Sequence, residues 1–317
     1  MSLPELRVSC RRDAASRATA ADLLPRANPC GRRTRTAGAW GASRRDYGET
    51  RRLRLGSPRS ERAEMATGAE AKGGRYLYAI VPATGQRAYN LAGIDGAPVY
   101  AIASGRVAAV VSDVPDARIR PERRHLAAQQ AVLQGLLAST DALLPMAFGS
   151  IADGPQAIQT ILASHQEILL RQLLRLAGMV EMGLRVSWDV PNIFEYFVHT
   201  HPDLRAARDR LLGLSRRPSQ EDKIELGRRF DRLLNEDRQN YTDRVADILF
   251  PYCQEIKRHH CRNEGEVMHL ACLVRRQVQD RFEEGVFAAA RLFDNNFTFD
   301  YNGPWPPHNF VAVDLKL

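Results

Sequence analysis

From residue 75 onward, the hydrophobic pattern changes repeatedly between the two-residue period of a strand and the three-to-four-residue period of a helix. Runs rich in β-branched and aromatic residues predict strands at residues 75–81, 99–103, 107–114, 143–151, 182–188, 267–274, 297–301 and 311–315. Helical runs are predicted at residues 121–140, 153–176, 190–217, 219–262 and 277–292. Strands and helices interspersed in this way favour the α+β class, in which helices lie on a face of a sheet.

The predicted elements divide into two groups of similar kind. Three strands, a helix and a fourth strand fill most of residues 65–153, and the other elements fill residues 154–317. We therefore expect two α+β domains, each with a mixed or antiparallel sheet and helices. In the second domain, Ser219 and Asp222 form a capping-box pattern at the start of a long helix, residues 219–262.

Residues 1–64 differ in composition from the rest of the chain. They hold 15 of the 45 basic residues, all of them arginine, and seven of the 37 acidic residues, which leaves 30 residues of each sign in residues 65–317. They contain no isoleucine, no phenylalanine and no hydrophobic period. Such a segment buries too little apolar surface to offset the entropy lost on ordering. We therefore expect a disordered, arginine-rich N-terminal extension.

Met65 directly precedes the first predicted domain, and three interpretations of the extension before it are open. We favour Met65 as the true start, so that residues 1–64 come from a mis-assigned upstream start. A transit peptide would also be rich in arginine, but it would be poor in acidic residues. A genuine basic tail would bind an anionic partner. A peptide from residues 1–60 in the mass spectrum of the native protein would refute the mis-assigned start.

The charge, cysteine and hydropathy patterns exclude several classes of protein. The whole excess of eight positive charges lies in residues 1–64, so the rest of the chain has no basic excess for nucleic acid. The five cysteines are odd in number and irregular in spacing, which is typical of free thiols in a reducing cytosol. No run reaches the roughly 20 apolar residues that span a bilayer. We therefore expect a cytoplasmic protein that binds neither nucleic acid nor membrane.

Three blocks of sequence are distinctive enough to compare with known families. The first joins residues 76–81 (YLYAIV) to residues 107–112 (VAAVVS). The second joins residues 144–149 (LPMAFG) to residues 180–188 (VEMGLRVSW). The third, residues 299–310 (FDYNGPWPPHNF), is the most distinctive because it collects many uncommon residues in one short run. In this order, the three blocks resemble the gas vesicle protein F/L family (GvpF/GvpL), in which the N-terminal extension has no counterpart.

The resemblance implies a function, a fold and a set of partners. Members of this family are accessory proteins required to form gas vesicles, which are gas-filled shells built from one small hydrophobic protein. It implies two α+β domains related to the ferredoxin-like arrangement and a location in the cytoplasm and at the gas vesicle. It implies the shell protein and other gas vesicle accessory proteins as partners, with no enzymatic activity, catalytic residue or cofactor. Whether the chain is the F-like or the L-like member is open.

A group of histidines and cysteines near the end of the predicted long helix raises the question of a metal site. His259, His260 and Cys261 are adjacent, and Cys253 lies seven residues before His260. On one helix that separation is about 10 Å, too far for both side chains to bind one zinc ion without further ligands. We therefore predict no metal site. His165, on an apolar helix stripe, is expected to be a hydrogen-bonded core histidine rather than a base.

The segment of residues 293–310 holds six of the 23 aromatic residues of the chain. Phe297, Phe299 and Tyr301 alternate with polar residues as a core-facing strand does, so we predict that they pack. Prolines on both sides of Trp305 restrict its burial in a strand ladder, which leaves both a packing and a recognition interpretation open. The candidate partner contacts are Pro304, Trp305 and His308.

Two other functions fit an α+β chain of this length. The main alternative is a regulatory protein that binds a small molecule in a concave polar pocket between its domains. An enzyme would use His308 or His165 with nearby carboxylates and would show a base of strongly perturbed pKa in a cleft. The sequence contains no nucleophile elbow, zinc-protease motif or phosphate loop that would support an enzyme. The assembly function is therefore the main prediction.

Overall fold

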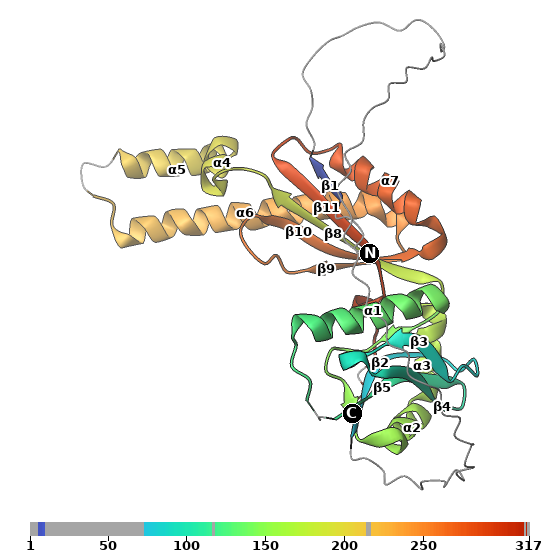
Figure 1. Ribbon diagram of the computed structural model, residues 1–317. Coiled ribbons are helices and arrows are strands. Elements are labelled where there is room, and N and C mark those ends of the chain that lie inside the picture. The colour runs from blue at the N-terminus through green and yellow to red at the C-terminus, as the bar shows by residue number, and fades with distance from the viewer. Residues whose placement is uncertain (1–5, 10–72, 116–117, 214–216, 314, 316–317) are drawn as a thin grey trace, which may run out of the picture. The chain divides into compact units, whose positions relative to one another are not determined.

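The computed structural model describes residues 6–9, 73–115, 118–213, 217–313 and 315 (Figure 1). Within these residues the chain forms two antiparallel sheets and seven α-helices. Four short 3-10 helices stand between them, at Ile94–Gly96, Phe250–Tyr252, Arg276–Val278 and His308–Phe310. The predicted α+β class is therefore confirmed.

The N-terminal sheet is built around a central strand, β2 (Gly74–Pro82). The strand order is β3 (Ala88–Ala92), β4 (Pro98–Ser104), β5 (Val107–Val114), β2 and β6 (Leu144–Pro145), and β7 (Ile151–Ala152) also pairs with β2. The turn between β4 and β5 places Gly105 at a φ of 59°, a left-handed conformation that glycine adopts without steric cost. A tight hairpin therefore joins the strands predicted at residues 99–103 and 107–114.

Helices cover both faces of the N-terminal sheet. On one face, α1 (Arg123–Ser139) packs against Tyr76 and Tyr78 of β2. On the other face, α2 (Gly154–Ser164) and α3 (Gln166–Arg175) pack against Leu77 and Ile80. Because both faces are covered, β2 is apolar along its length instead of alternating.

The C-terminal sheet has the strand order β1 (Leu6–Ser9), β11 (Phe297–Trp305), β8 (Met179–Trp188), β10 (Glu266–Arg275) and β9 (Glu255–His259). Between β8 and β9 the chain forms α4 (Ile193–Thr200), α5 (Pro202–Leu212) and α6 (Gln220–Leu249), and α7 (Gln279–Ala290) lies between β10 and β11. From β8 to β11 this is the strand–helix–strand–strand–helix–strand succession of a ferredoxin-like unit, with additional helices. The predicted ferredoxin-like relationship is therefore confirmed for this sheet.

The core of the C-terminal unit lies between its sheet and two helices. Phe230 of α6 and Phe282 of α7 are buried in one cluster with Leu184 of β8 and Leu270 of β10. Figure 1 shows α5 running alongside the N-terminal part of α6, and the two helices are in contact. The first turn of α6 carries the predicted capping box, in which Asp222 N–H donates to Ser219 Oγ at 3.1 Å and Ser219 N–H donates to Asp222 Oδ2 at 2.8 Å.

The long helix predicted for residues 219–262 is wrong at its C-terminal end. The helix α6 ends at Leu249, and a single 3-10 turn and the strand β9 follow it. Pro251 lacks the N–H that the next helical turn requires, and its ring clashes with the preceding turn. The residues after it pair with β10, so a contact distant in sequence overrides the local helical pattern.

Other predicted boundaries also differ. The predicted loop at residues 82–98 contains β3, and the predicted strand at residues 143–151 forms only the short β6 and β7. The predicted helix at residues 153–176 is divided at His165 into α2 and α3. The predicted turn at Asn302-Gly303 is absent from the described structure, because β11 continues through it with a shift of register.

The last predicted strand is also wrong. Residues 311–313 and 315 form no regular element.

A short part of the N-terminal extension is described. Residues Leu6–Ser9 form β1, which pairs with β11. The backbone groups on the edge of β11 supply the hydrogen-bonding partners that an isolated segment lacks. The rest of the extension and Met65 lie outside the described residues. The domain boundary between residues 153 and 154 stays a prediction.

Candidate functional site

The three candidate partner contacts lie in one short segment at the end of β11. Trp305 is half-buried, and its indole N–H donates to Asn302 Oδ1 at 2.7 Å. The carbonyl of Pro304 accepts a hydrogen bond from Gln134 Nε2 of α1 at 3.1 Å. His308 is exposed. These hydrogen bonds hold the segment in place and leave part of the indole and the imidazole open to solvent.

The chain beyond Trp305 is fixed by a cluster of charged side chains that we call the tail anchor, formed by Glu181, Lys257 and Arg175 around Asn309 and Phe310. The carboxylate of Glu181 accepts from Asn309 N–H at 2.9 Å and from Asn309 Nδ2 at 2.6 Å. Lys257 Nζ donates to the carbonyl of Asn309 at 2.7 Å, and Arg175 donates to the carbonyl of Phe310. The tail anchor therefore satisfies the backbone of a segment that has no strand partner.

Phe310 makes the end of the tail part of the hydrophobic core. Its ring is 0% exposed and lies in one cluster with Leu77, Leu169 and Leu273. Lys257 Nζ lies 5.4 Å from the centroid of the ring, within range of a cation–π interaction. The distinctive third sequence block therefore has a structural role at Phe310, independent of any partner.

The tail anchor was not predicted from the sequence. Glu181 alternates with apolar residues on β8 as a solvent-facing residue would, yet its side chain is buried. Burial raises the pKa of the Glu181 carboxyl above its ordinary value, although the hydrogen bonds from Asn309 and the nearby charges of His259 and Lys257 act in the opposite direction. No local pattern could have found this residue, because its partner Asn309 is 128 positions away.

Three alternating aromatic residues of β11 were predicted to pack in the core, and two of them, Phe297 and Phe299, are buried. Phe297 and Phe299 are buried, and both contact Phe293, with ring centroids 4.9 Å and 5.0 Å apart. Tyr301 is half-buried, and its hydroxyl donates to Glu283 Oε1 at 2.6 Å. The packing interpretation is therefore confirmed for Phe297 and Phe299.

His259, His260 and Cys261 lie on the strand β9 and in the loop after it, whereas Cys253 lies before β9, so the helix assumed for their geometry is wrong. His259 of β9 stands opposite His269 of β10, with the two ring centroids 4.9 Å apart. Burial and the nearby Arg185 and His259 lower the pKa of His269. Within the described residues, no group of three or more histidine, cysteine, aspartate or glutamate side chains is arranged to hold a metal ion.

His165 stands at the junction of α2 and α3. Its ring is half-buried, and Nδ1 lies 2.9 Å from the carbonyl oxygen of Ile161, to which it donates when that nitrogen is protonated. The expected hydrogen bond is confirmed, but the ring lies at the edge of the core and not inside it.

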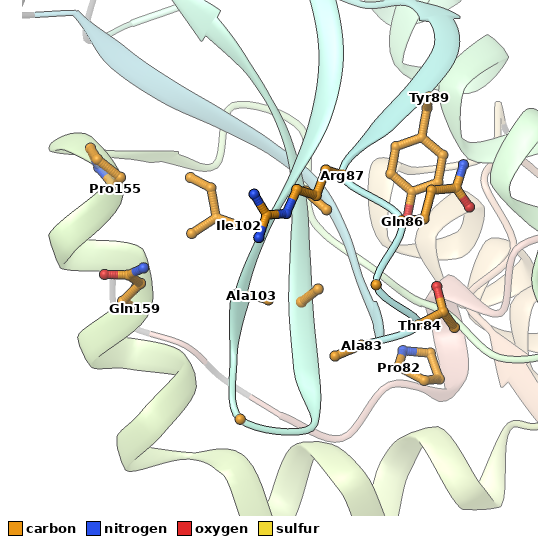
Figure 2. Close-up of a pocket in the computed structure, with 14 residues that line it drawn as sticks. Pro82, Ala83, Thr84, Gln86, Arg87, Tyr89, Ile102, Ala103, Pro155 and Gln159 are labelled. Carbon is orange, nitrogen blue, oxygen red and sulfur yellow. The ribbon is translucent and has the colours of Figure 1, made fainter.

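A cleft of about 620 Å³ opens in the N-terminal unit, between the loop after β2, β4 and α2 (Figure 2). Figure 2 shows Arg87, Ile102 and Gln159 reaching the cleft from these three elements. The lining that the structure describes contains no carboxylate, histidine or cysteine.

Several large apolar side chains point into solvent. Leu174 of α3 is 76% exposed, Leu212 of α5 is 71% exposed, and Phe250 after α6 is 73% exposed.

No helix of the described part of the chain is both long and apolar enough to span a membrane.

The fold places the chain among α+β proteins with one ferredoxin-like unit and a second antiparallel sheet. A family model described as "Gas vesicle synthesis protein GvpL/GvpF" matches residues 74–312. The chain belongs to this family, and the resemblance of the three sequence blocks is confirmed. The family gives the chain a role related to gas vesicles.

Two relatives and two solved structures show how far the similarity extends. Gas vesicle protein F of Dolichospermum flosaquae is 27% identical over 241 residues, which cover 75% of this chain and 98% of the relative. Gas vesicle protein L1 of Halobacterium salinarum is 24% identical over 274 residues, which cover 80% and 96%. Crystal structures of GvpF from an Anabaena species and from Microcystis aeruginosa superpose with TM-scores of 0.68 and 0.64 at 23% and 21% identity, each covering 76% of this chain and 99% of the other. These two structures confirm the fold.

Proposed function

We propose that this protein is a non-enzymatic accessory protein of gas vesicle assembly that binds the hydrophobic shell protein and other gas vesicle proteins. The observation that carries the proposal is the exposure of Leu174, Leu212 and Phe250 in a member of the GvpL/GvpF family. Each is more than 70% exposed, although burying such a side chain is worth about 1.5–3 kcal/mol. Binding of a partner that covers these side chains is therefore favoured by this free energy.

The physical reason for such a helper lies in the shell. A wall that holds gas must present apolar surface, so a free shell subunit exposes apolar area and tends to aggregate. A protein that binds the free subunit, or the growing edge of the wall, lowers the concentration of the unbound form by mass action. Less apolar surface is then exposed to water. The proposed site of action is the cytoplasm and the surface of the growing vesicle.

The segment of Pro304, Trp305 and His308 is a second proposed contact. Trp305 presents part of a large aromatic ring while its N–H is already satisfied by Asn302, so covering the ring removes no unpaired polar group from water. Rings held in this way are common anchors of protein interfaces.

The proposal is tested by purifying the tagged full chain from cells that make gas vesicles and identifying the proteins that accompany it. We expect the shell protein or other gas vesicle proteins to be enriched over a tag-only control. Enrichment is expected to fall in Leu174→Ser, Leu212→Ser or Phe250→Ser and to stay unchanged in Asn240→Ser, an exposed polar position on α6. If wild-type protein enriches no gas vesicle protein, the proposal is wrong.

The alternative function, binding of a small regulatory molecule, is supported by one observation, the open cleft at Arg87. Its guanidinium would bind an anionic group. A rise in melting temperature with an anionic metabolite, abolished in Arg87→Ala, would support this alternative.

A further inference from the structure

In the N-terminal sheet, β4 extends beyond the edge strand β3 that pairs with it. Its pairing with β5 runs on to Ser104, which stands opposite Val107, whereas its pairing with β3 ends at Tyr100. One more backbone bond follows on the β3 side, from Ala101 N–H to the carbonyl of Arg87 at 3.0 Å. Beyond this bond, no strand of the described part of the chain pairs with that side of β4. The end of β4 is therefore an open sheet edge.

Ala103 carries the backbone groups of this open edge. In an antiparallel ladder, the N–H and C=O of one residue face the same neighbouring strand, and those of the next residue face the other. Because Ala101 donates on the β3 side, Ala103 directs its N–H and C=O to that side as well. Ala103 is exposed and lines the cleft of about 620 Å³ described above. The cleft therefore offers a sheet donor and a sheet acceptor to a further strand.

The cleft lies where a further strand would continue the sheet (Figure 2). Residues from both faces of the sheet line it, since Ala101 packs against the core cluster on the α1 side and Ile102 belongs to the cluster on the α2 and α3 side. A pocket on one face would be lined from that face alone. The loop after β2 and the helix α2, which contributes Gln159, form the walls. An extended segment binds in such a space by adding a strand to the sheet edge.

The charge of the cleft indicates the chemistry of the segment. Among the described residues that line the cleft, Arg87 is the only one with a charged side chain. Arg87 is exposed and makes no ion pair with any described residue. A free guanidinium presents donors in a planar arrangement that matches a carboxylate. The segment that fits the cleft therefore carries a carboxylate close to the backbone that pairs with Ala103.

We propose that this cleft binds an extended peptide segment, which pairs with Ala103 as a strand and places a carboxylate on Arg87. The carboxylate belongs either to a chain terminus or to an aspartate or glutamate side chain. The inference goes beyond the proposed function, because the apolar residues proposed to bind gas vesicle proteins lie on other elements. It also differs from the binding of a small regulatory molecule, because only a peptide continues the sheet beside β4.

The test selects peptides from a library of random octapeptides, displayed with free C termini, on the immobilised full chain. Ala103→Pro removes the open N–H but no bond to β5, and proline is tolerated where the N–H of an edge faces away from the ladder. Ala103→Ser keeps the N–H and is its matched control. Arg87→Gln removes the charge in the cleft, and Arg106→Gln removes an exposed arginine of the adjacent turn that does not line the cleft.

We expect selected peptides, labelled for fluorescence anisotropy, to bind wild type, Ala103→Ser and Arg106→Gln with similar affinity. Ala103→Pro and Arg87→Gln are each expected to weaken binding at least about tenfold. Amidation of the C terminus weakens binding to wild type if the terminal carboxylate lies on Arg87. Replacement of an acidic side chain of the peptide by its amide weakens binding if that side chain lies there instead.

The proposal is overturned if no peptide is enriched on wild type over the bare matrix. It is also overturned if every enriched peptide binds Ala103→Pro, shown to be folded by circular dichroism, as tightly as Ala103→Ser. A cleft that binds a small anion instead would enrich no peptide, and succinate would raise the melting temperature of wild type but not of Arg87→Gln.

Should Ala103→Pro fail to fold, the backbone of the peptide is changed in its place. Two versions of a selected peptide are N-methylated at alternate amides, because only one of the two alternating sets of N–H groups faces β4. We expect one version to bind wild type at least about tenfold more weakly and the other to bind almost unchanged. Equal affinities of the two versions contradict strand pairing.

Discussion

The buried carboxylate of Glu181 accepts two hydrogen bonds from Asn309, one from its backbone N–H at 2.9 Å and one from its side chain at 2.6 Å. The two residues are 128 positions apart, on β8 and on the tail after β11. This pair fixes the segment between Trp305 and Phe310, so the tail anchor sets the position of the proposed partner contacts.

Replacing Asn309 by alanine removes one of these donors and leaves a buried charge less well solvated. We expect Asn309→Ala to lower the free energy of unfolding at pH 7 by about 1–3 kcal/mol. The matched control Asn240→Ala makes the same change at an exposed helix position and is expected to stay within about 0.5 kcal/mol of wild type. Urea denaturation followed by circular dichroism measures both differences.

The effect of Asn309→Ala should depend on pH. Burial raises the pKa of Glu181 above its ordinary 4.5, so the relative stability that this group contributes is fully present below pH 4.5 and is lost as the pH rises through the folded-state pKa. The variant raises this pKa further, because the lost bond stabilises the ionised form. We therefore expect the difference from wild type to be smallest near pH 4 and largest at pH 7. An equal difference at both values would contradict the assigned role of the carboxylate.

A buried phenylalanine, Phe310, and an exposed one, Phe250, can be compared to test whether the tail is part of the core. Phe310→Ala removes a ring that is 0% exposed and is expected to cost about 3–5 kcal/mol, which lowers the melting temperature by roughly 10 °C. Phe250→Ala removes a ring that is 73% exposed and is expected to change the free energy of unfolding by less than about 0.5 kcal/mol. Calorimetry of the two variants checks this, and similar losses in both would show that the tail is not part of the core.

Trp305→Ala separates packing from recognition at the candidate contact. The ring is half-buried and its N–H is bonded to Asn302, so we expect a loss of only about 1–2 kcal/mol in the free energy of unfolding together with weaker partner binding. The measurements are a thermal melt and the co-purification described above. A large loss of stability with unchanged co-purification would assign the ring to packing.

The capping box of α6 offers a test of the helix start. Ser219 Oγ accepts from Asp222 N–H at 3.1 Å, so Ser219→Ala leaves a backbone donor without its partner. We expect a loss of about 1 kcal/mol in the free energy of unfolding. Gln220→Ala, at the next position, should have little effect. Equal effects of the two substitutions would show that the cap does not stabilise α6.

Strands that are buried on both sides could be predicted from the sequence, because their signal is local. The apolar runs of β2 and β5 coincide with the predictions within a residue or two at each end. The alternation of Phe297 and Phe299 also placed both side chains in the core. Here local propensity and tertiary packing favour the same structure.

The predictions are wrong where a contact between residues far apart in sequence determines the local structure. Residues 255–259 carry one apolar and several charged residues, which suits an exposed helix face, but pairing with β10 makes them an edge strand. Glu181 has the spacing of an exposed residue, and only the returning tail buries it. Asn309 is an ordinary loop asparagine in the sequence. Its role depends on a carboxylate that another strand supplies, so the tail anchor had no local signal.

The most direct test of the central claim is to mix the purified full chain with purified shell subunit and follow light scattering and size-exclusion elution. We predict that wild-type protein delays aggregation of the subunit and elutes with it, whereas Leu174→Ser, Leu212→Ser or Phe250→Ser does so less effectively. Unchanged scattering and separate elution, with the other gas vesicle accessory proteins also present, would contradict the account.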